Sequence, residues 1–177
     1  MNLMTIIKLP SEGVRILKEK TYKIREFKEA DLDNVIHINR MCLPENYPSF
    51  FFMSIFYKFP KSFKVAVVNS ENTTCGYCMW RVEKGLSNFA LRWTKKAHLV
   101  SIAVLEPFRK LGIGESLLLK GMQSMKEEYN APEFILEVRL SNTAAIAMYE
   151  KHGYKKIKSL NAYYRDGEDA FMMALRI

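Results

Sequence analysis

The sequence predicts one α/β domain, in which a mixed β-sheet carries helices on both of its faces. The 177 residues suffice for one full hydrophobic core and are too few for two domains of ordinary size. Segments with the two-residue alternation of strands and segments with the helical period follow each other in the order β-α-α-β-β-β-α-β-α-β-β. Strands and helices that alternate in this way, without repeats or linkers, indicate a mixed sheet between helical layers.

Residues 1–20 carry no clear turn signals, and we expect an N-terminal arm or a short helix ahead of a domain of residues 21–177. Residues 22–27 alternate imperfectly and predict the first strand. A helix follows, since acids favour a helix N-terminus, and it ends by Leu43 because the residue before a proline is disfavoured in the helical region. The acids are Glu29, Asp31 and Asp33, and the expected buried stripe is Leu32, Val35, Ile36, Asn39 and Leu43.

The loop of residues 43–48 leads to a second helix at 49–59, rich in Phe and Tyr. Residues 63–68 and 74–82 predict two strands joined by a turn at 69–72, and residues 84–94 predict a longer loop. The remaining elements are strands at 98–105, 134–140, 154–160 and 170–177 and helices at 114–129 and 143–152. Ser141 and Asn142 supply the start of the last helix, and Gly153 closes it.

Composition places the chain among soluble globular proteins and sets few other limits. Its formal charge of +8 calls for an acidic partner, either a coenzyme with several phosphates or a nucleic acid met through the ribosome. No apolar run approaches the ~18 residues of a membrane span, and the start does not resemble a signal peptide. We therefore expect a cytoplasmic protein with no membrane partner.

The three cysteines are too few for a disulfide framework. Cys75 and Cys78 form a C-x-x-C, but they lie in a predicted strand, where residues three apart point to opposite faces. A structural zinc would need two further ligands at suitable spacing. We expect half-buried free thiols and no metal.

Residues 104–118 indicate an anion-binding turn. An apolar strand ends at Arg109 and Lys110, and the chain then passes Gly112 and Gly114 into a helix. Glycine allows close approach to a ligand, and the free N–H groups of a helix start favour phosphate. Neither a G-K-[ST] sequence nor the third glycine of the dinucleotide fingerprint follows, so the spacing alone fits phosphate binding and a plain strand-to-helix turn equally.

Residues 137–154 contain candidates for chemistry. Asn142 and Tyr149 are seven apart, about 20° from a common face of a helix, so that one ligand can meet both. Glu137 is a lone acid in an apolar strand, where the spacing slightly favours a plain ion pair with Arg139. His98 begins the neighbouring strand, and a solvated strand end is the alternative there.

Together these segments resemble the GNAT superfamily of N-acetyltransferases. Arg109-x-x-Gly112-x-Gly114 is similar to its acetyl-coenzyme A pyrophosphate loop, and residues 137–154 are similar to its N-x-x-A-x-x-x-Y segment with a following G-F/Y. Matches at 43–47, 98–104 and 163–170 make the chain most similar to the N-terminal (Nα) acetyltransferases. These comprise the bacterial ribosomal-protein alanine acetyltransferase and the archaeal and eukaryotic catalytic subunits. The resemblance covers roughly residues 22–177 and implies the GNAT acyl-CoA N-acyltransferase fold.

The resemblance implies direct transfer of the acetyl group of acetyl-coenzyme A to the α-amino group of protein N-termini, in a ternary complex. It implies Glu137, with His98 or through water, as the base and Tyr149 as the acid for the departing thiolate. Tyr47, Glu45, Glu137, Tyr163 and Tyr164 would then face the peptide. The coenzyme would lie on Ile102, Ala103, Val104, Arg109, Lys110, Leu111, Gly112, Ile113, Gly114, Glu115, Ser116, Asn142 and Tyr149.

Two alternatives stay open. The same fold acetylates lysine side chains or small amines in other enzymes, but Tyr163, Tyr164 and the loop at 43–47 favour a peptide N-terminus, from a ribosomal or nascent chain. A coenzyme A-binding or ribosome-associated protein without catalysis is the second alternative. The presence of both Glu137 and Tyr149 argues against it.

Overall fold

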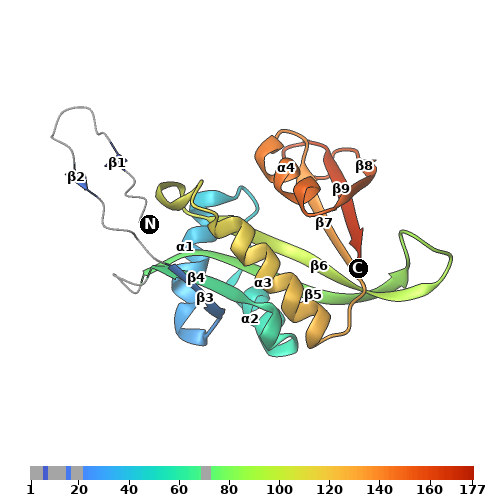
Figure 1. The fold of residues 1–177 in the computed structure, drawn as a ribbon, viewed down its shortest axis with the longest axis horizontal. Helices are drawn as coiled ribbons and strands as arrows, with labels where there is room; N and C mark the ends of the chain where they lie inside the picture. The colour runs from blue at the N-terminus through green and yellow to red at the C-terminus, as the bar shows by residue number, and fades with distance from the viewer. Residues whose placement is uncertain (1–5, 8–14, 17–21, 69–72) are drawn as a thin grey trace.

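The computed structural model describes residues 6–7, 15–16, 22–68 and 73–177. Its main feature is a mixed seven-stranded sheet with the strand order β3-β4-β5-β6-β7-β9-β8 (Figure 1). This is the predicted α/β class, and from β3 onwards the strands and longer helices follow in the predicted order.

The bounds of the elements differ from the predicted ones mostly by one or two residues. The strands of the main sheet are β3 (Tyr22–Glu26), β4 (Lys64–Val68), β5 (Thr73–Leu86), β6 (Trp93–Val104), β7 (Glu133–Arg139), β8 (Lys155–Leu160) and β9 (Ala170–Arg176). The helices are α1 (Leu32–Cys42), α2 (Ser49–Lys58), α3 (Ile113–Glu127) and α4 (Thr143–Lys151), with short 3-10 turns η1 (Glu29–Asp31), η2 (Pro60–Ser62) and η3 (Glu106–Phe108). None of the described helices combines the length and apolarity needed to cross a bilayer.

The predicted N-terminal arm is described only in part. Strands β1 (Ile6–Ile7) and β2 (Arg15–Ile16) pair antiparallel, so the described part of the arm is a strand pair and not the short helix considered from the sequence. The rest of the arm and the predicted turn at 69–72 lie outside the described residues.

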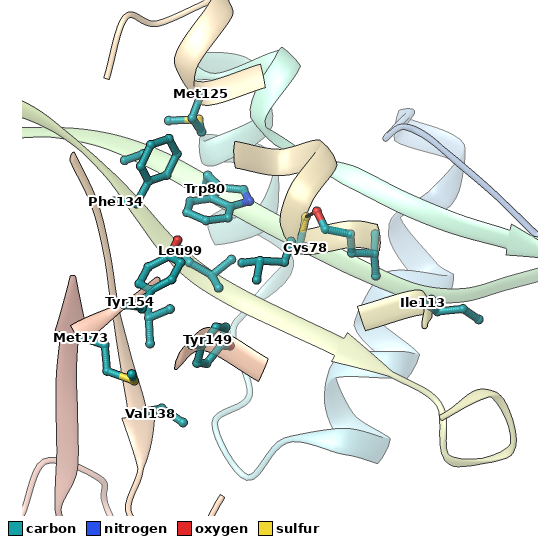
Figure 2. Close-up of a cluster of buried hydrophobic side chains, with 14 of the residues drawn as sticks. Cys78, Trp80, Leu99, Ile113, Met125, Phe134, Val138, Tyr149, Tyr154 and Met173 are labelled. Carbon is teal, nitrogen blue, oxygen red and sulfur yellow. Dashed lines mark hydrogen bonds between the residues drawn. The ribbon is translucent and has the colours of Figure 1, made fainter. Parts of the chain in front are cut away.

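Helices cover both faces of the sheet, as predicted (Figure 1). On the face of α1 and α2 the core contains Val35, Phe52 and Tyr77. On the face of α3 and α4 it contains Trp80 and Phe134, whose ring centroids lie 6.0 Å apart (Figure 2). Helix α3 approaches Trp80 through Gly121, where an added Cβ would lie 2.1 Å from the indole nitrogen. The predicted stripe of α1 missed Ile38, which is buried with Val35 and Asn39.

The sheet opens between β6 and β7. These strands run parallel and pair at three positions, Lys96 with Glu133, Ala97 with Phe134 and His98 with Ile135. Among the described residues their ladder goes no further, although β6 pairs with β5 as far as Val104 and β7 with β9 as far as Arg139. Alternate residues of the range 99–104 therefore present backbone N–H and C=O groups towards a gap, while the others face β5. This opening positions the site described below.

The long β5–β6 hairpin corrects one prediction. Residues 84–94 were expected to form a loop, but β5 continues to Leu86 and β6 starts at Trp93. Much of the extension is exposed, so its ladder carries no clear apolar alternation that the sequence could reveal. Buried Glu133 accepts hydrogen bonds from the Ser87 hydroxyl and the Asn88 N–H group, which anchors the hairpin tip. His98 consequently lies inside β6 and not at its start.

The cysteine prediction was wrong in two respects. Cys75 and Cys78 are free, as expected, but both are fully buried and not half-buried. Both also contact the same core, on the face of α3. The cause is a bulge, because Ala66 pairs with Gly76 and Val67 with Thr74, which leaves Cys75 unpaired and breaks the alternation of β5.

Candidate active site

The turn between β6 and α3 has the geometry of a phosphate cradle. Gly112 precedes the first residue of α3 with a φ of +76°, a left-handed conformation that favours glycine. The Ser116 N–H group already donates to the Gly112 carbonyl at 2.9 Å, and the N–H groups of the residues between them point out of the helix end. A cavity of about 300 Å³ lies against this turn, lined by Arg109, Lys110 and Gly112 among others.

A second cavity, of about 350 Å³, occupies the opening between β6 and β7. Its walls include Ile102, Ala103 and Val104 on one side and Asn142 and Tyr149 on the other. The two cavities share Val104, Gly114 and Met148, so they form one path from the cradle into the sheet. Cys42 also lines this path, and its thiol lies 3.5 Å from the Val104 carbonyl.

The path has the form that a phosphorylated, extended ligand requires. A diphosphate fits the cradle, because free N–H groups and the positive end of α3 meet there. The amides of a pantetheine arm fit the backbone edge of residues 102–104, which no strand pairs on the side of β7. The predicted coenzyme residues Leu111, Ile113, Glu115 and Ser116 all belong to this turn and to the first residues of α3, although Glu115 pairs with Lys151 and His152 and Ser116 with Tyr22.

At the inner end of the path, Glu137 pairs with His98. The Glu137 carboxylate lies 2.7 Å from Nε2 of His98, and the carboxylate of Glu83 lies 2.7 Å from Nδ1. The side chains of His98 and Glu137 are 12% and 16% exposed. Burial alone would lower the pKa of His98, but the hydrogen bonds to both carboxylates outweigh it and raise that pKa to about 9. His98 is therefore an imidazolium at neutral pH.

Arg139 does not pair with Glu137. Its guanidinium contacts Glu45, Asp166 and Glu168, which leaves Glu137 to His98. β7 lies between β6 and β9 and is not an edge strand. The plain Glu137–Arg139 ion pair considered from the sequence is thus wrong, and so is the solvated strand end considered for His98.

Tyr149 reaches the cavity from α4 and is 4% exposed. Burial raises the pKa of its phenol far above neutral, so the hydroxyl keeps its proton. Asn142 lies one residue before α4 and caps it, accepting a hydrogen bond from the Ala145 N–H group at 3.2 Å. Both predicted residues line the same cavity, as their spacing suggested.

Two loops form the mouth of the larger cavity. The loop of residues 43–48 contributes Glu45 and Tyr47, and the loop of residues 161–169 contributes Tyr163 and Tyr164. Burial, with the nearby Glu137 carboxylate, raises the pKa of Tyr163 to about 12. All the predicted peptide-facing side chains therefore surround one opening.

Sequence reasoning missed two supporting residues. Glu83 holds His98 from β5, and Asn39 bonds to Tyr47 N–H, the Glu45 carbonyl and the Tyr77 hydroxyl. Asn39 carried a signal, since a polar residue in a predicted buried stripe requires hydrogen-bond partners. Glu83 carried none, because its approach to His98 depends on the β5–β6 register and on a bulge between Met79 and Trp80.

Comparison with known proteins agrees with this geometry. Residues 32–154 match the acetyltransferase (GNAT) family, and the chain therefore belongs to that family. An N-alpha-acetyltransferase from Sulfurisphaera tokodaii is 51% identical over 159 residues, which cover 89% of this chain and 94% of the relative. This chain is an acyltransferase of that N-alpha-acetyltransferase type, and acetyl-coenzyme A is its cosubstrate.

Solved structures show the same fold. Ard1 from Thermoplasma volcanium has a TM-score of 0.75 at 29% identity, with 88% of this chain and 97% of that chain covered. Naa20 from Chaetomium thermophilum in complex with a bisubstrate analogue has a TM-score of 0.74 at 27% identity, with 88% and 86% covered. The GNAT fold implied by the sequence is confirmed.

Proposed function

We propose that the acceptor is the α-amino group of a protein N-terminus and that Glu137 takes up its proton. The observation that carries this proposal is the position of Glu137, between the coenzyme path and a mouth formed by Tyr47, Tyr163 and Tyr164. A peptide end that enters between these side chains reaches the Glu137 carboxylate.

The charge state of His98 favours Glu137 over His98 as the base. An α-amino group has a pKa of about 7.7 to 8.0 and must lose a proton before it attacks the thioester. His98 is already protonated at neutral pH because its pKa is about 9, so it acts as a hydrogen-bond donor to Glu137. Glu137 accepts the amine proton, directly or through water.

Tyr149 completes the proton transfers. As the new N–C bond forms and the C–S bond breaks, the electron pair of the C–S bond goes to sulfur. The Tyr149 hydroxyl, which keeps its proton and belongs to a residue that lines the path, then donates that proton to the thiolate. Both reactants are held at once, which is direct transfer in a ternary complex.

A peptide panel tests the acceptor. Acetyl transfer is measured by mass spectrometry on one lysine-containing peptide with a free N-terminus and on the same peptide with a blocked α-amine. We expect acetylation of the free α-amine only. Acetylation of the lysine in the blocked peptide would reassign the chain to side-chain amines, and no transfer to any amine would favour a non-catalytic coenzyme-binding protein.

Glu137→Gln tests the base. Turnover should fall by ~10²-fold at neutral pH and recover in large part at high pH, where the amine is already neutral. A constant ratio of mutant to wild-type rate from pH 6.5 to 9.5 would leave Glu137 a positioning role only.

We further propose that the protein acts in the cytoplasm on ribosomal or nascent chains. The formal charge of +8 and the exposed lysines of edge strand β8 (Lys155, Lys156 and Lys158) support contact with an anionic assembly such as the ribosome. Co-sedimentation with ribosomes should be salt-sensitive and should weaken when these lysines are changed to glutamine. Sedimentation that is independent of both salt and these lysines would contradict this part of the proposal.

A further inference from the structure

Arg139, at the end of β7, holds four side chains that come from both loops of the mouth. Its Nη1 lies 2.7 Å from Asp166 and 2.7 Å from Glu168, and its Nη2 contacts Glu45. The ring centroid of Tyr164 lies 3.9 Å from the guanidinium carbon. The Arg139 side chain is 15% exposed and those of Glu45 and Glu168 are 26% and 28% exposed, so these two contacts are partly shielded from water, whereas Asp166 is 55% exposed.

The partners of Arg139 belong to the two walls of the peptide opening. Glu45 lies in the loop of residues 43–48, and the other three lie in the loop of residues 161–169. In sequence these loops are more than a hundred residues apart. Arg139 is thus a bridge across the opening, two residues beyond Glu137 on the same side of β7.

Each loop keeps its own supports that do not involve Arg139. Asn39 accepts from the Tyr47 N–H group at 3.3 Å and donates to the Glu45 carbonyl at 3.2 Å. In the other loop, Glu168 accepts from the Ser141 N–H group at 2.9 Å, and its carbonyl accepts from the Tyr164 N–H group at 3.1 Å. Each loop therefore has hydrogen bonds that do not come from the guanidinium.

What depends on Arg139 is the spacing between the loops. Three carboxylates surround one guanidinium, which leaves two negative charges in excess. Without the guanidinium these carboxylates would repel one another across a partly shielded gap. Glu45 would move away from Asp166 and Glu168, and Tyr47 would move with it, away from Tyr163 and Tyr164.

We propose that Arg139 is a positioning residue that sets the width of the peptide opening by tying its two loops together. The proposal rests on the proposed function, in that the opening receives the acceptor. It concerns acceptor binding and not the pyrophosphate cradle, since the cradle at Gly112 lies on the other cavity.

Steady-state kinetics at saturating acetyl-coenzyme A test this. Arg139→Ala should raise KM for the peptide by roughly 10-fold or more, with a smaller change in kcat and an unchanged Kd for acetyl-coenzyme A by calorimetry. Arg139→Lys should give an intermediate KM. An ammonium keeps the positive charge, but it lacks the planar guanidinium geometry that hydrogen-bonds several carboxylates at once. Arg165→Ala, which removes an exposed arginine of the same loop, is the matched control and should behave as wild type.

A rescue experiment separates this role from a merely structural one. Asp166→Asn with Glu168→Gln removes the charge of two contacts and so weakens the tie without creating repulsion, and its KM should lie between those of wild type and Arg139→Ala. Adding Arg139→Ala to that pair should leave KM at the intermediate value, below that of Arg139→Ala alone. If Arg139→Ala does not fold, the Asp166→Asn, Glu168→Gln variant still tests the tie through its raised KM.

Two results would overturn the proposal. One is a peptide KM in Arg139→Ala, or in Asp166→Asn with Glu168→Gln, equal to that of wild type. The other is a triple variant whose KM equals that of Arg139→Ala. The blocked peptide decides the identity of the acceptor separately. A lysine acceptor would contradict the proposed function, but the order of the KM values would still decide the role of Arg139.

Discussion

His98 should make the stability of the protein depend on pH above neutrality. Its pKa is about 9 in the folded protein against 6.5 for a free imidazole. A raised folded pKa means that protonation stabilises the fold: the contribution is fully present below pH 6.5 and is lost as the pH rises through 9. The rise from 6.5 to about 9 corresponds to about 3 kcal/mol, most of which is lost between pH 7 and pH 10.

Urea denaturation of wild type and His98→Gln from pH 6 to pH 10 measures this contribution. The difference in unfolding free energy between the two should shrink by about 2 to 3 kcal/mol across that range. Other groups with raised pKa values, such as the thiols of Cys75 and Cys78, titrate in both proteins and cancel in the difference. Glu83→Gln should move the loss to lower pH, because it removes one of the two carboxylates that hold the imidazolium. A difference that stays constant within about 0.5 kcal/mol would refute the assignment of His98 as an imidazolium.

Three further predictions concern the cradle, the acid and the packing of α3. Gly112→Glu should abolish acetyl-coenzyme A binding, because a side chain is strained at a φ of +76° and its charge repels phosphate; unchanged affinity by calorimetry in the folded variant would remove the cradle assignment. Tyr149→Phe should lower kcat by ~10²-fold or more with nearly unchanged acetyl-coenzyme A affinity, and near-normal turnover with rate-limiting chemistry would count against the acid role. Gly121→Ala should destabilise the fold by ~1 to 3 kcal/mol, since its Cβ would lie 2.1 Å from the indole nitrogen of buried Trp80; an unchanged melting temperature would contradict that packing.

The elements with strong local signals could be predicted from the sequence. The helix at 143–152 has a capping asparagine and a closing glycine, and the cradle has its glycines at the strand-to-helix turn, so the structure differs little there. The β5–β6 hairpin failed because its extension is exposed and therefore carries no apolar period. Local sequence patterns were sufficient wherever burial sets an apolar period or backbone geometry requires a particular residue type.

The partners within the site could not be predicted in the same way. Glu137 and Arg139 are two residues apart and lie on the same side of any strand, so the sequence alone slightly favoured their pairing. The structure separates them because the register of β6 and β7 brings His98 to Glu137, and two distant loops bring three carboxylates to Arg139. Which ion-pair partner each residue takes depends on the register between strands and on the position of distant loops. The apolar period of a single segment carries no information on either.

The burial of the cysteines makes the chain suited to chemical labelling. The thiols of Cys75 and Cys78 are fully buried and their pKa values are raised to about 11 and about 12, so they resist alkylation in the folded protein. Cys42 is only partly buried and lines the coenzyme path beside Val104. A maleimide or iodoacetamide reagent should therefore modify Cys42 alone, without any engineered cysteine. The rate of that modification becomes a footprint of cosubstrate occupancy, slowed by acetyl-coenzyme A in proportion to the fraction bound.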